Sequence, residues 1–158
     1  MIYSGFAGIG KTHASKHKEN ILDLESSQFQ WVNANDGKSI EESKGSYKEK
    51  NKDWPSNYIN RIKTEEQLGY TILISAQPRV LSLLKGNGLK FVTVTPNKGD
   101  KVVYLTRYMS RGNSIAFVQS MQANFDKYID DLDNNEDALY HIKLNRGDFI
   151  SSIFYGVD

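Results

Sequence analysis

The chain has 158 residues, a formal net charge of +1, 39% hydrophobic residues and 25% charged residues. This length suits one compact domain, and we expect a single domain over residues 1–158. The balanced charge argues against general nucleic-acid binding, and the absence of cysteine excludes disulfides and thiolate chemistry. No apolar run reaches the ~18 residues of a spanning helix, and no signal-peptide pattern opens the chain, so we expect a soluble, cytoplasmic protein.

Short apolar runs alternate with helical patterns along the chain. Two of the runs, TILIS and KFVTVT, are almost continuously apolar or β-branched, which is typical of strands buried on both faces of a parallel sheet. The alternation predicts an α/β protein with three layers and a five-stranded parallel sheet. The predicted strands are Met1–Ser4, Asn20–Leu24, Tyr70–Ser75, Leu89–Thr95 and Ala138–Leu144. The predicted helices are Lys11–Lys18, Pro55–Glu66, Pro78–Lys85, Gly99–Arg111, Ser114–Leu132 and Asp148–Phe154.

A phosphate-binding motif follows the first predicted strand. Residues 5–12 read GFAGIGKT and match G-x-x-x-x-G-K-[ST] at every fixed position, which defines a P-loop. The glycines allow the backbone to turn tightly and to bring its N–H groups onto phosphate oxygens. Lys11 adds a positive charge for the β- and γ-phosphates, and Thr12 supplies a hydroxyl for Mg²⁺. We therefore predict that ATP and Mg²⁺ bind at Gly8, Ile9, Gly10, Lys11 and Thr12.

Further polar segments follow other predicted elements. Asp23 and Glu25 end the second strand, SAQPR (residues 75–79) follows the third, and Arg107 and Arg111 lie four residues apart in YLTRYMSRG. Together with the P-loop, these segments resemble the adenylate-kinase-like nucleoside monophosphate kinases, in particular small P-loop proteins of bacteria and their phages. The resemblance covers most of the chain and implies a three-layer P-loop NTPase fold.

The resemblance also implies roles for these residues. Shikimate and gluconate kinases carry a similar pair of acids, which assigns Asp23 to the outer shell of the metal and Glu25 to the acceptor or the metal. Arg79 matches the arginine that holds the acceptor phosphate in the D-G-F-P-R segment of adenylate kinases. The aspartate of that segment is the usual Mg²⁺ partner, and here Ser75 or Ala76 takes its place. We therefore expect Asp23 to carry more of the metal's coordination.

Two more arginine sites follow from the same resemblance. Arg107 and Arg111 share one face of a helix and resemble lid arginines, so residues 98–113 are expected to act as a lid-like segment. Such cations stabilise the charge that spreads over the transferred phosphoryl group. Arg146, in the loop after the last strand, is expected to lie beside the adenine ring of ATP and to stack on it.

An insertion at residues 26–66 interrupts the alternation. Its first part, up to Lys52, is polar, and such long loops are usually functional or disordered. We interpret the insertion as a cover over the acceptor, although a plain surface excursion is the alternative. Aromatic rings here can stack on a base, and Trp31 and Trp54 can instead anchor the insertion to the body. The residues expected to contact the acceptor are Glu25, Phe29, Trp31, Trp54, Tyr58, Arg61 and Arg79.

These features predict an ATP-dependent phosphotransferase whose first-choice acceptor is a nucleoside monophosphate. Small-molecule nucleotides are then its partners. One alternative is a kinase with a hydroxyl acceptor, for which Asp23 or Glu25 has to take the proton. Another alternative is a nucleotide-binding regulatory protein with little transfer activity. The missing aspartate favours the regulatory interpretation, and the paired arginines oppose it.

Overall fold

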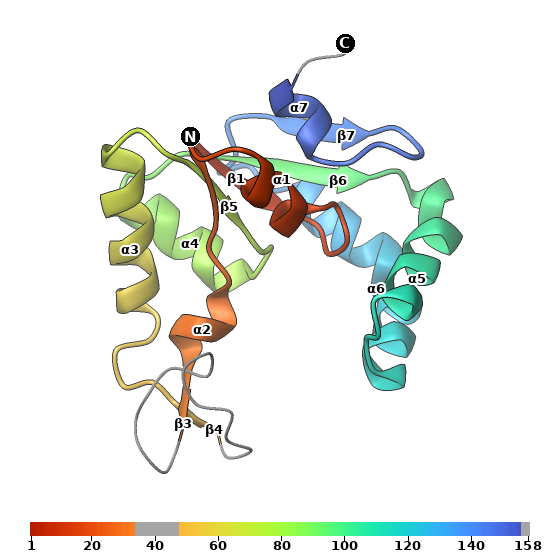
Figure 1. Cartoon of the computed structure of the whole chain (residues 1–158), viewed down its shortest axis with the longest axis horizontal. Coiled ribbons are helices and arrows are strands. Elements are labelled where there is room, and N and C mark those ends of the chain that lie inside the picture. The colour runs from red at the N-terminus through yellow and green to blue at the C-terminus, as the bar shows by residue number, and fades with distance from the viewer. Residues whose placement is uncertain (34–47, 156–158) are drawn as a thin grey trace.

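The computed structural model describes residues 1–33 and 48–155. Its main sheet has five strands in the order β2-β5-β1-β6-β7, and every neighbouring pair is parallel (Figure 1). This confirms the predicted α/β fold with a five-stranded parallel sheet. The strands are β1 (Ile2–Gly5), β2 (Ile21–Asp23), β5 (Thr71–Ile74), β6 (Phe91–Pro96) and β7 (His141–Leu144).

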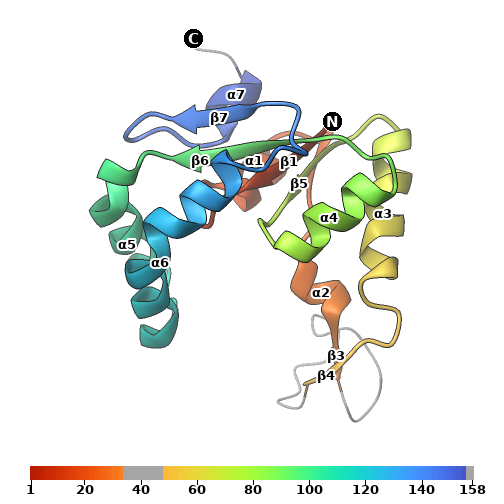
Figure 2. The same ribbon diagram turned by 180° about the vertical axis from the view of Figure 1, so that it is seen from behind.

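Helices cover both faces of this sheet and complete the three layers. Helices α1 (Lys11–His17) and α7 (Ser151–Tyr155) lie on one face, and α4 (Pro78–Gly86) and α6 (Ile115–Asp133) lie on the other (Figures 1 and 2). Helix α3 (Ser56–Gln67) packs against β5 and α4. Within the described residues, no helix is both long enough and apolar enough to cross a membrane.

Two parts of the chain project from the same edge of the sheet (Figure 1). One consists of the short 3₁₀ turn η1 (Lys98–Asp100), α5 (Lys101–Ser110) and the first turns of α6. The other consists of α2 (Ser26–Gln30) and the antiparallel strands β3 (Trp31–Asn33) and β4 (Lys48–Lys50). The sequence predicted an irregular stretch from residue 26 to 52, whereas its described parts form a short helix and a strand pair. Residues 34–47 of the predicted insertion lie outside the described residues.

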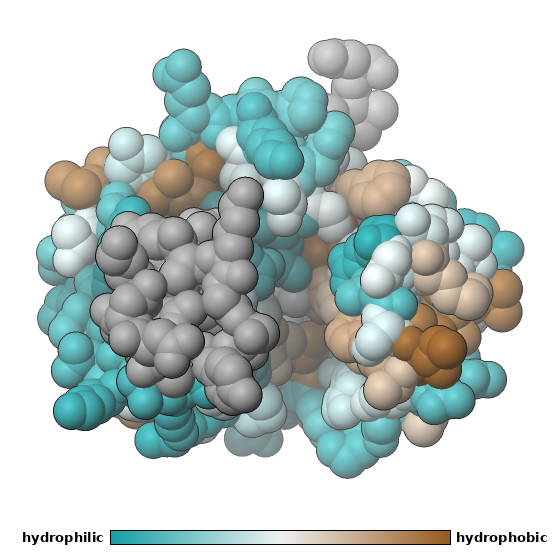
Figure 3. Space-filling model, turned by 60° about the horizontal axis from the view of Figure 1, so that its bottom comes forward, coloured by the Kyte–Doolittle hydropathy of each residue, from teal (hydrophilic) through white to brown (hydrophobic). Residues whose placement is uncertain are grey.

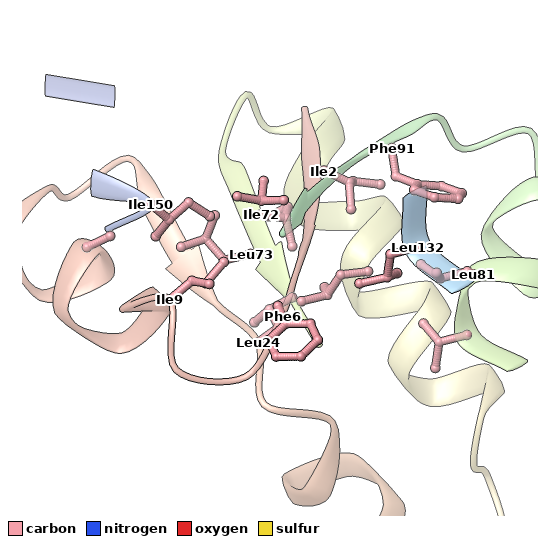
Figure 4. Packing of buried hydrophobic residues seen from close by; sticks show 14 of the residues in the cluster. Ile2, Phe6, Ile9, Leu24, Ile72, Leu73, Leu81, Phe91, Leu132 and Ile150 are labelled. Atoms are coloured by element: carbon pink, nitrogen blue, oxygen red, sulfur yellow. The ribbon is translucent and has the colours of Figure 1, made fainter. Parts of the chain in front are cut away.

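The core lies between the sheet and its helices, and it also holds the P-loop in place. Ile2, Ile72 and Phe91 are completely buried on the central strands (Figure 4). From the P-loop itself, Phe6 is 2% exposed and Ile9 is completely buried. Burying a side chain of this size contributes about 1.5–3 kcal/mol. The loop is therefore fixed by its apolar side chains, which leaves its backbone free to face a ligand.

Candidate active site

The P-loop connects β1 to α1 in a conformation that requires glycine. Gly8 and Gly10 have φ angles of 86° and 89°, a region that other residues rarely adopt. The space around them is also filled: a Cβ atom at Gly8 would lie 2.8 Å from the Tyr108 ring, and one at Gly10 would lie 3.0 Å from the Phe149 ring. Glycine at these two positions is therefore demanded both by backbone geometry and by packing.

Lys11 folds back along the P-loop. Its Nζ donates to the carbonyl oxygens of Gly5 at 3.3 Å and Phe6 at 3.5 Å. Burial lowers the pKa of its ammonium group from the ordinary value, whereas the negative charges of Asp23 and Glu25 act in the opposite direction. The ammonium group therefore lies in the concave side of the loop, where a phosphate chain would meet it.

Thr12 and Asp23 meet at the end of β2. The Thr12 hydroxyl donates to Asp23 Oδ2 at 2.7 Å, and the other carboxylate oxygen, Oδ1, is buried without a hydrogen-bond partner. A hydroxyl and a carboxylate are the oxygen ligands that Mg²⁺ prefers. Among the described residues, no group of three or more His, Asp or Glu side chains could hold a metal alone. The pair therefore fits a magnesium ion that takes its remaining ligands from phosphate and water.

A cavity of about 760 Å³ opens on the P-loop and extends between α4 and α6. Figure 3 shows the molecule hollowed between its two projections, with hydrophobic residues on the α5–α6 side. Polar and apolar residues both line the cavity, and its α6 side carries Lys127 and Asp131 as well as apolar side chains. Its polar lining includes Lys11, Glu25, Ser26, Ser75, Gln77 and Arg111, and its apolar lining includes Leu81, Phe117, Met121, Tyr128 and Leu132.

Three uncharged side chains that are joined by hydrogen bonds, Ser26, Ser75 and Gln77, form the floor of this cavity. The Gln77 side-chain amide donates to the Ser26 hydroxyl at 2.9 Å, and the Ser26 and Ser75 hydroxyls are 3.4 Å apart. Ser75 follows β5, where the resembled kinases carry their magnesium-binding aspartate. The floor therefore bears no charge at this point, and the carboxylate beside the P-loop threonine comes from β2 instead.

A second cavity, of about 420 Å³, lies on the other side of the P-loop between α5 and the loop after β7. Arg107 lines it, donates to the Gly8 carbonyl oxygen at 3.0 Å, and lies 4.2 Å from the centre of the Phe149 ring. Arg111 lines both cavities. Both arginines expected in the lid-like segment therefore lie beside the phosphate-binding backbone, together in the smaller cavity.

The structure brings together most residues of the predicted ATP and metal sites. Lys11, Thr12, Asp23 and Glu25 lie at the carboxyl edge of the parallel strands, where open α/β sheets bind ligands. Ile9 contributes backbone only, because its side chain belongs to the core. No bound nucleotide tests these roles, so they stay predictions.

The predicted stacking role of Tyr58 is wrong. This side chain is completely buried, and its hydroxyl donates to the Leu24 carbonyl oxygen at 2.5 Å. Its ring stacks on Trp54 at 5.5 Å and packs on Phe29 at 5.1 Å. The ring contacts hold Phe29 and Trp54 against Tyr58, and the bond to Leu24 joins this group to the body, which agrees with the alternative interpretation for Trp54. Trp31 is half-buried on β3 opposite Lys50 and does not line either cavity.

Three predicted arginine sites lie away from both cavities. Arg61 is exposed on α3 and pairs with Glu65 at 2.7 Å. Arg79 is exposed at the start of α4 and has no hydrogen-bond or ion-pair partner among the described residues. Arg146 pairs with the buried Asp100 at 2.8 Å, a bond that holds the β7 loop to the start of α5. In this conformation, none of the three contacts the space beside the P-loop.

Sequence reasoning missed Phe149 and the cavity floor. Phe149 is partly exposed, packs on Gly10 and faces the Arg107 guanidinium. It lies three residues after Arg146, in the loop that the resemblance placed beside the adenine ring. An aromatic side chain in that loop was the available signal. No local pattern singles out Ser26 and Gln77, because they meet only when α2 packs beside the end of β5.

The arrangement of sheet, P-loop and flanking helices defines a P-loop NTPase-like fold of three layers. The chain matches a solved structure of a tunicamycin resistance protein from Deinococcus radiodurans with a TM-score of 0.56 and 16% identity, over 96% of this chain and 90% of that one. An uncharacterized protein from Eubacterium ventriosum matches with a TM-score of 0.47 and 14% identity, over 93% and 89% of the two chains. No protein-family model and no curated protein matches the sequence. At these identities the likeness concerns the fold alone.

Proposed function

We propose that this protein is an ATP-dependent phosphotransferase that acts on a small-molecule acceptor. The observation that carries the proposal is the position of the P-loop between two cavities, with Lys11 beside the larger one and Arg111 in both. One cavity suits the nucleotide and the other suits an acceptor, and a phosphoryl group passing between them would meet the cations. The solved structure of similar fold is named for resistance to a small molecule, tunicamycin, which makes small molecules the first acceptors to test.

In the proposed reaction, the P-loop backbone and Lys11 bind the β- and γ-phosphates of ATP. Thr12 and Asp23 hold a magnesium ion, whose charge offsets that of the phosphates. Arg107 and Arg111 stabilise the negative charge that spreads over the transferred group. The partly exposed ring of Phe149 offers a flat surface for the adenine ring. The chain thus acts by positioning and by charge stabilisation.

The acceptor has two candidate classes. The resemblance to nucleoside monophosphate kinases favours a nucleoside monophosphate as the acceptor. A hydroxyl compound is supported by Glu25, a carboxylate in the same cavity. Both classes leave the proposed use of ATP unchanged.

Replacing Lys11 tests the proposal. We expect Lys11→Ala to weaken ATP binding and to reduce phosphoryl transfer by about 10²–10³-fold, because one preorganised cation is lost. Labelled ATP with Mg²⁺ measures binding, and label in the acceptor measures transfer. Lys16→Ala, an exposed change on the same helix, is the matched control. Well-folded wild-type protein that does not bind ATP contradicts the proposal.

A further inference from the structure

We infer that the acceptor is a hydroxyl compound with an apolar or aromatic body, that it carries no phosphate of its own, and that Glu25 takes its proton. This inference rests on the proposed function and specifies its acceptor site. It depends on three features of the larger cavity: the positions of the arginines, the free carboxylate beside the P-loop, and the apolar side chains of α6.

Few of the arginines in the chain are placed to bind a phosphate group on the acceptor. The arginines of the chain are Arg61, Arg79, Arg107, Arg111 and Arg146. Only Arg111 lines the larger cavity, and because it also lines the cavity of Arg107 it is placed for the transferred phosphoryl group. Lys127, further along the cavity, pairs with Asp131 at 2.8 Å. A second phosphate would therefore lack the arginine fork that usually binds such groups.

A carboxylate stands free beside the P-loop. Asp23 is engaged by the Thr12 hydroxyl, and Asp131 is engaged by Lys127. Glu25 lines the cavity with Lys11, is exposed, and has no hydrogen-bond or ion-pair partner among the described residues. An anionic phosphate acceptor would be repelled by this charge and would need no base. A hydroxyl acceptor does need one, and general bases of this kind contribute about 10²–10⁴-fold to rate.

The remaining lining suits a mostly uncharged molecule. Ser26, Ser75 and Gln77 are neutral and hydrogen-bonded to one another, so they can orient hydroxyl or amide groups. Phe117, Met121 and Tyr128 of α6 add apolar surface beyond them, and the charges of Lys127 and Asp131 on the same helix offset each other in an ion pair. A volume of about 760 Å³ falls within the range of about 300–1,000 Å³ that small-molecule sites usually have.

The proposed transfer exchanges one bond to the γ-phosphorus for another. The acceptor hydroxyl oxygen forms a bond to the γ-phosphorus of ATP as the bond from that phosphorus to the bridging β–γ oxygen breaks. ADP leaves with the electron pair, and the hydroxyl proton passes to the Glu25 carboxylate, which returns it to water. The products are ADP and a phosphate monoester of the acceptor.

Paired acceptors test the acceptor class. The pairs are 2-phenylethanol with 2-phenylethyl phosphate and uridine with its 5′-monophosphate, and glycerol and tunicamycin are added as single compounds. With γ-labelled ATP and Mg²⁺, we expect label in phosphate monoesters of hydroxyl compounds and no diphosphate products. Diphosphate products, or no transfer to any of the hydroxyl compounds, overturn the inference. Binding of labelled ATP, measured separately, tells whether the proposed function has failed as well.

Substitution tests the assigned residues with the best hydroxyl acceptor of that panel. Glu25→Gln should reduce transfer by about 10²–10⁴-fold without weakening ATP binding. Glu25→Asp, which keeps the carboxylate, should retain part of the rate. Glu25 makes no side-chain cap bond to α2, so these changes leave the helix intact. Glu19→Gln, at an exposed site outside both cavities, is the matched control. A Glu25→Gln protein with the wild-type rate overturns the assignment.

A separate substitution tests whether the apolar side chains of α6 contact the acceptor. Tyr128→Ala should raise KM for 2-phenylethanol by about 3–10-fold, the loss expected for one aromatic contact, and should leave KM for glycerol unchanged. Leu139→Ala removes an exposed apolar side chain outside both cavities and is the control. Equal changes for the two acceptors contradict the role given to α6.

Discussion

The P-loop and the insertion use their side chains in opposite ways. In the P-loop, Phe6 and Ile9 point into the core, and the backbone and Lys11 are left to face a ligand. In the insertion, the half-buried Trp54 stacks on the completely buried Tyr58. Aromatic residues close to a site can therefore serve packing and bind no ligand. The P-loop motif, by contrast, constrains the backbone itself, so its presence in the sequence predicts the conformation of the loop.

Removing the Tyr58 ring should destabilise the protein without altering a binding surface. We expect Tyr58→Ala to lower the free energy of unfolding by about 3–5 kcal/mol, because a large buried side chain is lost. Urea unfolding measures this change. Tyr58→Phe keeps the ring and loses only the hydrogen bond to Leu24, so its cost should be nearer 1 kcal/mol. If Tyr58→Ala were as stable as the wild type but bound the acceptor poorly, the ring would belong to the site after all.

Thr12→Val should weaken the use of magnesium. Valine keeps the shape of threonine but removes the hydroxyl that donates to Asp23. We expect the concentration of Mg²⁺ needed for half-maximal ATP binding to rise by about 10–100-fold, as for other changes around metal ligands. Ser15→Ala, on the same helix, removes a hydroxyl that bonds only to the Thr12 carbonyl oxygen and serves as the control. An unchanged magnesium requirement would remove Thr12 from the metal site.

Gly10→Ala should weaken ATP binding through the backbone. A side chain at a φ of 89° costs about 1–2 kcal/mol, and here its Cβ would also press on Phe149. We expect an affinity about tenfold lower, which is about 1.4 kcal/mol, in a titration with labelled ATP. Gly69→Ala is a close control, because Gly69 has a φ of 93° but nothing within 4 Å of the new Cβ. Equal losses of affinity in both variants would point to general strain.

Arg61→Ala should have the smallest effect. Its ion pair with Glu65 is an exposed contact between residues four apart on a helix, worth about 0.3–0.5 kcal/mol. We expect a nearly unchanged free energy of unfolding and an unchanged KM for the acceptor. Lys63→Ala, an exposed change on the same helix, provides the comparison. A large rise in KM for Arg61→Ala alone would restore the acceptor role that the sequence suggested.

The sequence predicted the fold well because its signals are local. Buried parallel strands are continuously apolar, and the residues of a P-loop have a fixed spacing. The sequence alone therefore predicted both the parallel sheet and the position of the P-loop. The acceptor side depends on packing between distant segments. The sequence suggested that Tyr58 binds a ligand, whereas the packing of α3 against β5 buries it. The sequence also suggested that Arg79 binds the acceptor, whereas α4 directs it into solvent. No spacing rule encodes such directions.

The Arg111 side chain links the two halves of the site. The Arg111 guanidinium belongs to the walls of both cavities, so whatever occupies one of them sets the position and electrostatic environment of a group that lines the other. Affinities for the two substrates are then not independent quantities. By thermodynamic reciprocity, the factor by which ATP alters the dissociation constant of the acceptor equals the factor by which the acceptor alters that of ATP.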